Sequence, residues 1–495
     1  MTPAFILPYA FALRAGIIAR QDMTGRTKLY SRPDVSISAL IESQRLCGGP
    51  VACQRISEAE YENLLSETYR SSASRAADIA AGAATDLVAL AENAAEVEDL
   101  LDAREDAPVV QLINALLIEA VREKASDVHV EVHEHRLVIR FRIDGVLQDR
   151  LEPKRSLGPM LVSRIKVMAG LDIAEKRKPH DGRVTLTLGG HEIDVRVSTI
   201  PSQYGERVVL RLLDRTTARF DLTRLGMSER DLGVTRRLLE KPGGMILVTG
   251  PTGSGKTTTL YSAISYLNSR ERNIMTIEDP VEYAFDGIGQ MQVNAQKQLT
   301  FAEGVRVLMR QDPDVILIGE IRDPETAAAA IRATTSGHLV LATLHTTSAV
   351  ASITRLTDMG VDRYLLSTLV SGLIAQRLVR CLCETCKKPG SVSAEEAARL
   401  NGRLRAGETT FRATGCKDCN FMGYRGRTAI YEVVLCDPGM ATLIYEGAAQ
   451  PALAGWARRA GPGLLDDGLA RVRSGVTTIE EVVAAAEIEE PYTDG

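Results

Sequence analysis

Residues 250–257 of the chain (Gly-Pro-Thr-Gly-Ser-Gly-Lys-Thr) have the residue types and spacing of a phosphate-binding loop, G-x-x-x-x-G-K-[ST]. Glycines let successive backbone N–H groups turn toward a phosphate, and a helix that begins there adds the positive end of its dipole. In such a loop Lys256 reaches the β- and γ-phosphates, and the hydroxyl of Thr257 can bind Mg²⁺. The residues predicted to hold the nucleotide are Gly250, Pro251, Thr252, Gly253, Ser254, Gly255, Lys256, Thr257 and Thr258.

The residues on either side of this loop predict a strand before it and a helix after it. The apolar run 245–248 predicts a buried strand, and Leu260, Ile264 and Leu267 follow helical spacing from Thr258 onward. A glycine-rich turn that matches the motif by chance would lack this context. The chain is therefore predicted to bind a nucleoside triphosphate.

A second candidate group is Glu320, which ends the mostly apolar stretch 314–320. A buried strand beside a phosphate loop can deliver a carboxylate to the metal shell or to the attacking water. The alternative is an exposed glutamate at the end of a strand. The charged pair Arg322-Asp323 follows after one residue and favours a site at this position.

Three acidic residues within five positions, Glu278, Asp279 and Glu282, follow another apolar run, 273–277. At the end of a sheet they can orient the attacking water or bind Mg²⁺ indirectly. A charged, solvated loop explains the same residues about equally well.

Two histidines, His338 and His345, flank the apolar run 339–344. A histidine at the end of a strand can donate to the γ-phosphate and so report hydrolysis, and His345 is the candidate for this role. Taken alone, either histidine is more often a structural residue.

Four cysteines form two C-x-x-C pairs, Cys383 with Cys386 and Cys416 with Cys419. Two such pairs close a tetrahedral S₄ zinc site, which leaves no open position and is therefore structural rather than catalytic. Four buried free thiols are the alternative. Cys381 competes with Cys383 as a ligand, although its spacing to Cys386 is less usual.

Length and composition exclude several classes of protein. A chain of 495 residues is too long for one core, and its formal net charge of −5 gives no global signal for nucleic-acid binding. The start of the sequence lacks the cationic region of a signal peptide, and the longest apolar run, 364–375, is too short to span a bilayer. These features indicate a cytoplasmic protein.

The pattern of elements predicts an α/β nucleotide domain with a mainly parallel sheet, because the strands 273–277, 315–318 and 339–344 alternate with helical stretches. Before it, helical spacing within 112–121 and strand alternation on both sides of the turn Asp144-Gly145 predict an α+β domain.

The apolar opening Leu7–Ile18 is either a docking surface or part of a small local core. The predicted domains are a platform-docking module at 1–70, a helical or mobile linker at 71–107, the α+β domain at 108–215, a nucleotide domain at 216–380, a tetracysteine element at 381–427 and a helical part at 428–495.

Together these motifs resemble the motor ATPases of the type II secretion and type IV pilus superfamily. The phosphate loop, the acidic segment 277–282, the long string 310–323 and the histidine segment 337–345 match that family's Walker A motif, Asp box, Walker B signature and His box. The resemblance covers roughly residues 105–490. Two departures, Ser336 and Thr347, touch no expected catalytic group.

The resemblance implies a homohexameric ATPase with a RecA-like P-loop domain and the cofactors ATP, Mg²⁺ and structural Zn²⁺. It also implies that Arg196 and Arg211 of the preceding α+β domain reach the phosphates, for which permanently charged guanidinium groups are suited. Surface ion pairs are the alternative explanation for either arginine.

The resemblance further implies indirect membrane association in a Gram-negative bacterium. Residues 1–100 would dock on the cytoplasmic domain of an inner-membrane platform protein, beside a polytopic platform protein. ATP hydrolysis would then drive pseudopilus assembly and protein export across the outer membrane, and the tetracysteine element argues for assembly rather than retraction. Two alternatives remain: a type IV pilus assembly ATPase, and a P-loop motor that handles nucleic acid.

Overall fold

The computed structural model describes residues 7, 15–21, 27–33, 35–47, 51–58, 60–61, 64, 87, 91, 108–188, 191–214, 220–294 and 297–486. Contacts divide the chain into two compact units. The first comprises Met1–Ile143 and Leu147–Thr216, and the second comprises Asp144–Val146 and Thr217–Gly495.

The amino-terminal part of the first unit contains a small three-stranded sheet with strand order β1-β2-β3. Its elements are β1 (Ile17–Gln21), β2 (Thr27–Ser31), α2 (Ile37–Leu46) and β3 (Cys53–Arg55). Leu7 is fully buried in one cluster with Ile17 and Leu29, so this end of the predicted apolar opening packs a local core. Residues 8–14 lie outside the described residues, so a docking surface on the opening Leu7–Ile18 stays a prediction. The predicted linker 71–107 also lies outside them, apart from Leu87 and Ala91.

The rest of the first unit is an α+β domain with a six-stranded antiparallel sheet in the order β6-β5-β4-β9-β8-β7. Its elements are α5 (Pro108–Arg122), β4 (Asp127–Val132), β5 (Leu137–Ile143), β6 (Val146–Leu151), α6 (Leu157–Met168), β7 (His180–Leu188), β8 (His191–Ser202) and β9 (Gly205–Asp214). Leu112, Leu116 and Val130 share one buried cluster, which places α5 on the sheet as the helical spacing predicts. Asp144 and Gly145 both have positive φ, as the tight turn between β5 and β6 requires.

The second unit is built on a seven-stranded sheet with strand order β12-β11-β13-β14-β10-β15-β18. The first six strands run parallel to their neighbours, and β18 joins antiparallel at one edge. Up to β15 its elements are η1 (Leu222–Arg224), α7 (Glu229–Leu239), β10 (Gly244–Thr249), α8 (Lys256–Leu267), β11 (Ile274–Glu278), β12 (Ile288–Gln292), α9 (Phe301–Leu308), β13 (Val315–Ile318), α10 (Pro324–Thr335), β14 (Leu339–Leu344), α11 (Ala351–Asp358), α12 (Arg363–Leu369) and β15 (Val370–Leu382).

The remaining elements of the second unit follow β15. They are β16 (Lys388–Ser391), α13 (Ala394–Arg399), β17 (Thr409–Arg412), η3 (Lys417–Cys419), β18 (Tyr424–Leu435), α14 (Pro438–Glu446), α15 (Gln450–Ala460), α16 (Leu464–Arg473) and α17 (Ile479–Ala486). Among the described ranges, every helix of the chain is too short or too polar to span a lipid bilayer.

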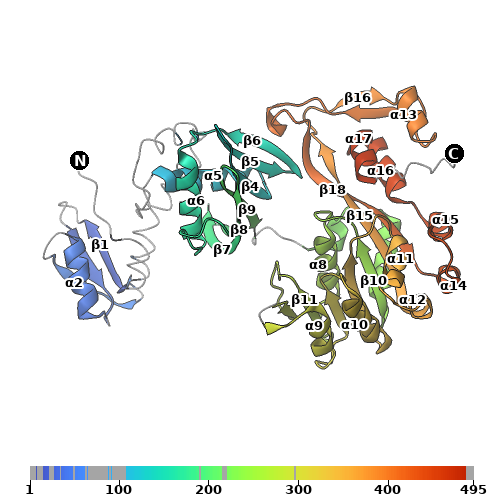
Figure 1. Ribbon diagram of the computed structural model, residues 1–495, viewed down its shortest axis with the longest axis horizontal. Coiled ribbons are helices and arrows are strands. Elements are labelled where there is room, and N and C mark those ends of the chain that lie inside the picture. Colours follow the sequence, from blue (N-terminus) through green and yellow to red (C-terminus); the bar gives the residue numbers. More distant parts are fainter. Residues whose placement is uncertain are drawn as a thin grey trace. The chain divides into compact units, whose positions relative to one another are not determined.

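Helices cover both faces of this sheet, and the interior strand β10 shows why (Figure 1). Its side chains alternate between two buried clusters: Met245 and Leu247 pack with α9, α10 and α11, whereas Ile246 and Val248 pack with α7 and α8. A strand buried on both faces carries a continuous apolar sequence, which is the pattern of 245–248. The predicted α/β class with a mainly parallel sheet is therefore confirmed.

The tetracysteine element is an insertion between two strands of this sheet. β15 and β18 pair from Gly372 with Leu435 to Leu382 with Tyr424, and the residues between the two strands carry β16, α13, β17 and η3 (Figure 1). The predicted limits of the element, 381 and 427, therefore fall inside β15 and β18. Sequence alternation did not reveal these strands because β15 is buried along most of its length.

The interior strand β10 offers a test of this packing. Leu247 is fully buried, so Leu247→Ala should lower the free energy of unfolding by about 3 kcal/mol through lost contacts and the cavity that remains. Trp456 in α15 is the chain's single tryptophan, so its fluorescence during urea unfolding reports the second unit. Lys297→Ala, at an exposed position of the same unit, is the control and should change this free energy by less than about 0.5 kcal/mol. Equal effects of the two substitutions would contradict the described packing.

Candidate functional site

Three predicted site residues meet at one edge of the large sheet. Strands β13, β14 and β10 are neighbours in that order and run parallel, so their carboxyl ends lie at the same edge. The phosphate loop follows β10, Glu320 follows β13, and His345 follows β14. Topology thus brings together Lys256, Glu320 and His345, which are far apart in the sequence.

The phosphate loop has the backbone that its glycines permit. Gly253 and Gly255 have φ values of +79° and +86°, in the left-handed region, and α8 begins directly after Gly255. The hydroxyl of Ser254 is buried and has no hydrogen-bond partner among the described residues. An unpaired buried hydroxyl in a loop of this shape fits a ligand with acceptor oxygens, as a nucleotide phosphate has.

Lys256 is anchored to the loop that precedes it. Its Nζ donates to the carbonyl oxygens of Gly250 at 2.7 Å and Pro251 at 2.9 Å. Burial lowers the pKa of Lys256 to about 8, which Glu320 partly opposes and Arg377 reinforces. The charged ammonium group is therefore held at the carboxyl edge of the sheet, where it has lost part of its hydration. A neighbouring phosphate would offset this loss.

Glu320 lies between two cationic or polar partners. Its carboxylate is 2.5 Å from Nη2 of Arg322 and 3.5 Å from Nε2 of His345, and 15% of its side chain is exposed. Burial lowers the pKa of His345, and the nearby Lys256 adds to this effect. His345 is therefore mainly neutral at pH 7 and keeps one N–H donor. This arrangement can orient a water molecule and a phosphate oxygen together.

The three acidic residues at the end of β11 and beyond it have different surroundings. Glu278 is 4% exposed and accepts hydrogen bonds from Tyr261, from Thr276 at 2.6 Å and from Gln290 at 3.2 Å. These partners occupy both carboxylate oxygens, so the geometry favours a structural function for Glu278 within the sheet.

Asp279 and Glu282 follow beyond the strand end. Asp279 contributes to the electrostatic field at Arg322, which also pairs with Glu320. The backbone N–H of Glu282 donates to the hydroxyl of Tyr261 at 3.2 Å. A role for either carboxylate toward water or metal stays a prediction.

The two histidines lie at opposite ends of β14. His345 follows the strand, whereas His338 precedes it and its Nδ1 is 2.7 Å from the carbonyl oxygen of Ala333. His345 thus lies beside Glu320, whereas His338 contacts the end of α10.

The two predicted arginines belong to the first unit. Arg196 on β8 and Arg211 on β9 lie directly opposite each other in the antiparallel register. Nε of Arg211 is 3.0 Å from Oδ1 of Asp127, and 64% of the Arg211 side chain is exposed. Arg211 is thus both paired with Asp127 and largely exposed to solvent. Its contact with a phosphate stays a prediction.

Sequence reasoning missed residues that support the phosphate loop from β15. Gln376 accepts a hydrogen bond from Thr259 at 2.6 Å, and its Nε2 would lie 2.7 Å from a Cβ added at Gly255. Arg377, which is 5% exposed, follows directly. The one available signal was a glutamine and an arginine directly after the apolar run 364–375.

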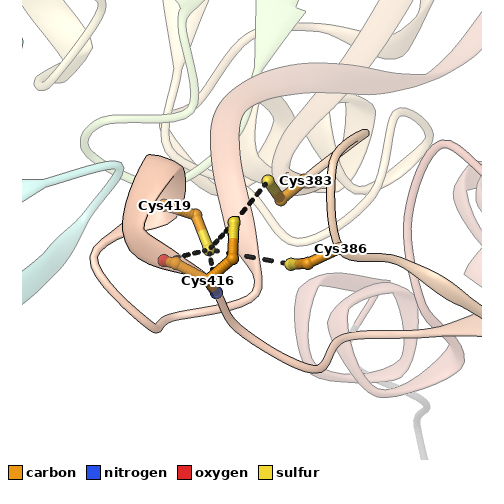
Figure 2. Close-up of side chains that lie close together, drawn as sticks. All are labelled: Cys383, Cys386, Cys416 and Cys419. Atoms are coloured by element: carbon orange, nitrogen blue, oxygen red, sulfur yellow. Dashed lines mark hydrogen bonds between the residues drawn. The ribbon is translucent and has the colours of Figure 1, made fainter.

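The four predicted zinc ligands converge in space (Figure 2). The sulfur atoms of Cys383, Cys386, Cys416 and Cys419 all lie within 4.8 Å of one another. Three of the separations, Cys383–Cys416, Cys386–Cys419 and Cys416–Cys419, are 3.9, 3.8 and 3.8 Å. A tetrahedron with Zn–S bonds of about 2.3 Å has edges of about 3.8 Å, so the cluster fits zinc.

The surroundings of the cluster also suit a thiolate site. The backbone N–H groups of Cys416 and Gly423 each donate to Sγ of Cys419 at 3.2 Å, an arrangement that stabilises negative charge on sulfur. Cys381 is outside the cluster, so the geometry selects Cys383 as the fourth ligand.

Comparison with known proteins agrees with these features. The family model for type II/IV secretion system proteins matches residues 102–484, and the model for an amino-terminal domain of GSPII protein E matches residues 6–69. The chain is 51% identical over 479 residues to the type II secretion system protein E of Pseudomonas aeruginosa, covering 96% of this chain and 95% of that protein. It is 48% identical over 483 residues to the type II secretion system ATPase E of Vibrio cholerae, covering 96% of each.

The fold is also similar to that of solved structures. The pilus retraction motor PilT with bound ADP matches with a TM-score of 0.52 and 27% identity, covering 77% of this chain and 97% of that one. The ATPase DotB of Legionella pneumophila matches with a TM-score of 0.56 and 20% identity, covering 75% of this chain and 94% of that one, which shows a shared fold. The resemblance inferred from the motifs is confirmed. The chain therefore belongs to the family of the type II secretion system ATPase E.

Proposed function

We propose that this chain hydrolyses ATP and couples hydrolysis to pseudopilus assembly and protein export across the outer membrane. The observation that carries the proposal is the meeting of Lys256, Glu320 and His345 at the carboxyl edge of one parallel sheet. Extensive identity to a type II secretion ATPase supports the secretion assignment over the pilus alternative.

Within this site each side chain has a distinct task. Lys256 binds the β- and γ-phosphates and balances their charge in a buried environment. His345 donates its N–H to the γ-phosphate and so distinguishes the triphosphate from the diphosphate. Glu320 orients the attacking water and accepts its proton at a carboxylate oxygen.

Thr257 and Glu320 would hold Mg²⁺, directly or through water. When bound, the ion neutralises the charge that develops on the phosphate oxygens. Among the chain's own groups, Arg322 holds the Glu320 carboxylate in place at 2.5 Å.

We further propose a ring of six copies in which Arg196 and Arg211 sense the γ-phosphate. Their neighbouring positions on β8 and β9 present two permanent charges side by side. Sedimentation of the chain with a non-hydrolysable ATP analogue tests the ring, which predicts a six-copy species. Substitution of either arginine by alanine should lower kcat with little change in the affinity for ADP; unchanged kcat would contradict the sensing role.

The amino-terminal module is proposed to dock on the cytoplasmic domain of an inner-membrane platform protein, which would make a cytoplasmic enzyme peripheral to that membrane. Ile41 on α2 is 62% exposed and offers an apolar contact. Capture of the full chain by that cytoplasmic domain should weaken in Ile41→Asp, whereas Tyr364→Ala in the second unit should bind as the unsubstituted chain does. Undiminished capture of Ile41→Asp would exclude this contact.

The role of Lys256 gives a direct prediction. Lys256→Met should weaken ATP binding by about tenfold to hundredfold, because charge-assisted hydrogen bonds to the phosphates are lost. Titration with a fluorescent ATP derivative measures the affinity, and Lys297→Met, at an exposed position of the same unit, is the control. An affinity unchanged in Lys256→Met would contradict the assignment.

The lowered pKa of Lys256 predicts a pH dependence of nucleotide binding. In the free protein Lys256 loses its proton as the pH rises through about 8, and binding must then restore that proton. Affinity for ATP should therefore fall by about tenfold per pH unit above this value. The guanidinium of Lys256→Arg stays charged over this pH range, so any change in its affinity for ATP reports titration of the nucleotide itself. Identical profiles between pH 7 and 9.5 for the two proteins would contradict burial of the ammonium group.

The cysteine cluster is proposed to bind structural zinc. Purified protein should contain about one zinc ion per chain by mass spectrometric metal analysis, because four thiolates close the coordination shell. Cys416→Ser should lose the metal and melt at a lower temperature. Cys381→Ser is the matched control and should keep both, since Cys381 lies outside the cluster. Loss of zinc from Cys381→Ser alone would overturn the ligand assignment.

A further inference from the structure

Arg377 lies on β15, beside the point where β14 and β10 end and the phosphate loop begins. In the register of the sheet, Leu344 of β14, Thr249 of β10 and Ala375 of β15 form one row. Arg377 is two residues beyond this row and is 5% exposed. Its side chain is therefore buried at the edge of the sheet that carries Lys256, Glu320 and His345.

The guanidinium group of Arg377 connects segments on both sides of β10. Its Nη2 donates to the carbonyl oxygen of Thr347 at 2.5 Å, and its Nη1 donates to the carbonyl oxygen of Gln376 at 3.0 Å. Thr347 follows β14, whereas Gln376 belongs to β15, and β10 lies between these two strands. The side chain thus crosses the carboxyl end of β10, where the phosphate loop begins.

The first residue of the phosphate loop makes room for this crossing. A Cβ added at Gly250 would lie 2.5 Å from the carbonyl oxygen of Gln376 and 3.2 Å from Nη1 of Arg377. A side chain at position 250 would displace the guanidinium or the strand. The glycine therefore serves close packing against Arg377 as well as the phosphate-binding turn.

A second contact ties the same two segments together. The backbone N–H of Thr346 donates to Oγ1 of Thr249 at 3.0 Å, and the two threonine hydroxyls are 2.6 Å apart. Of the two residues that follow His345, Thr346 is thus bonded to the end of β10 and Thr347 is bonded to Arg377 on β15. These contacts fix the backbone directly after His345.

We propose that Arg377 is a positioning residue that holds the segment 345–347 against the phosphate loop, so that His345 faces the γ-phosphate. This inference rests on the proposed sensing role of His345. A planar guanidinium with two donor groups spans two carbonyl oxygens, whereas a lysine ammonium is a single point and does not reproduce the bridge.

If Arg377 had a purely structural role, its removal would change the affinities for ADP and ATP in a different way. If it only shaped the phosphate loop, its removal would weaken ADP and ATP binding alike, because both nucleotides use that loop. If it acts through His345, its removal lowers the preference for the triphosphate and leaves ADP binding nearly unchanged. The ratio of the two affinities therefore separates the roles.

The test compares the full chain with Arg377→Gln, Arg377→Lys, His345→Ala and the double variant His345→Ala with Arg377→Gln. Fluorescent derivatives of ADP and of a non-hydrolysable ATP analogue are titrated into each protein. Arg380→Gln is the matched control, since Arg380 lies on the same strand and pairs instead with Glu481 at 2.5 Å. Thermal melts establish that each variant is folded, and Arg377→Lys decides the test should Arg377→Gln unfold.

The proposal predicts that both Arg377 variants lose about tenfold of the triphosphate preference, as His345→Ala does. The double variant should lose no more than either single one, because residues that act through one another are not additive. Equal weakening toward both nucleotides, or additive losses in the double variant, would overturn it. An unchanged preference in His345→Ala would refute instead the sensing role in the proposed function.

Discussion

The parallel pairing of β13, β14 and β10 is the constraint on which the site depends. Parallel strands end at one edge, so a lysine, a carboxylate and an imidazole from three distant segments meet there. Burial lowers the pKa of two of these groups, the ammonium of Lys256 and the imidazole of His345, and the histidine is therefore mainly neutral at pH 7. The strands in turn are held by two apolar cores, one on each face of the sheet.

The sequence predicted these three strands and the phosphate loop well because each has a strong local pattern. A strand buried on both faces is a short apolar run, and the loop's glycines and Lys256 have fixed spacing. The cysteine pairs were equally clear, since ligand spacing reports directly on the S₄ cluster.

Other features could not be predicted because they depend on contacts between distant segments. Glu278 was grouped with Asp279 and Glu282 by adjacency, yet its carboxylate is buried against Tyr261, Thr276 and Gln290. Arg377 follows an apolar run that carries no motif, and only the strand order places it beside the phosphate loop. The predicted limits of the tetracysteine element fall inside β15 and β18, because the pairing of these two distant strands leaves no local pattern in the sequence.

The most direct test of the central claim is the turnover of Glu320→Gln measured together with its affinity for ATP. Glutamine keeps the size of the side chain and removes the charge that orients and deprotonates water. The account predicts ATP binding within a fewfold of the unsubstituted chain and a kcat at least about 100-fold lower. ATP hydrolysis at an undiminished rate in Glu320→Gln would show that the reaction does not depend on this carboxylate, and would contradict the account.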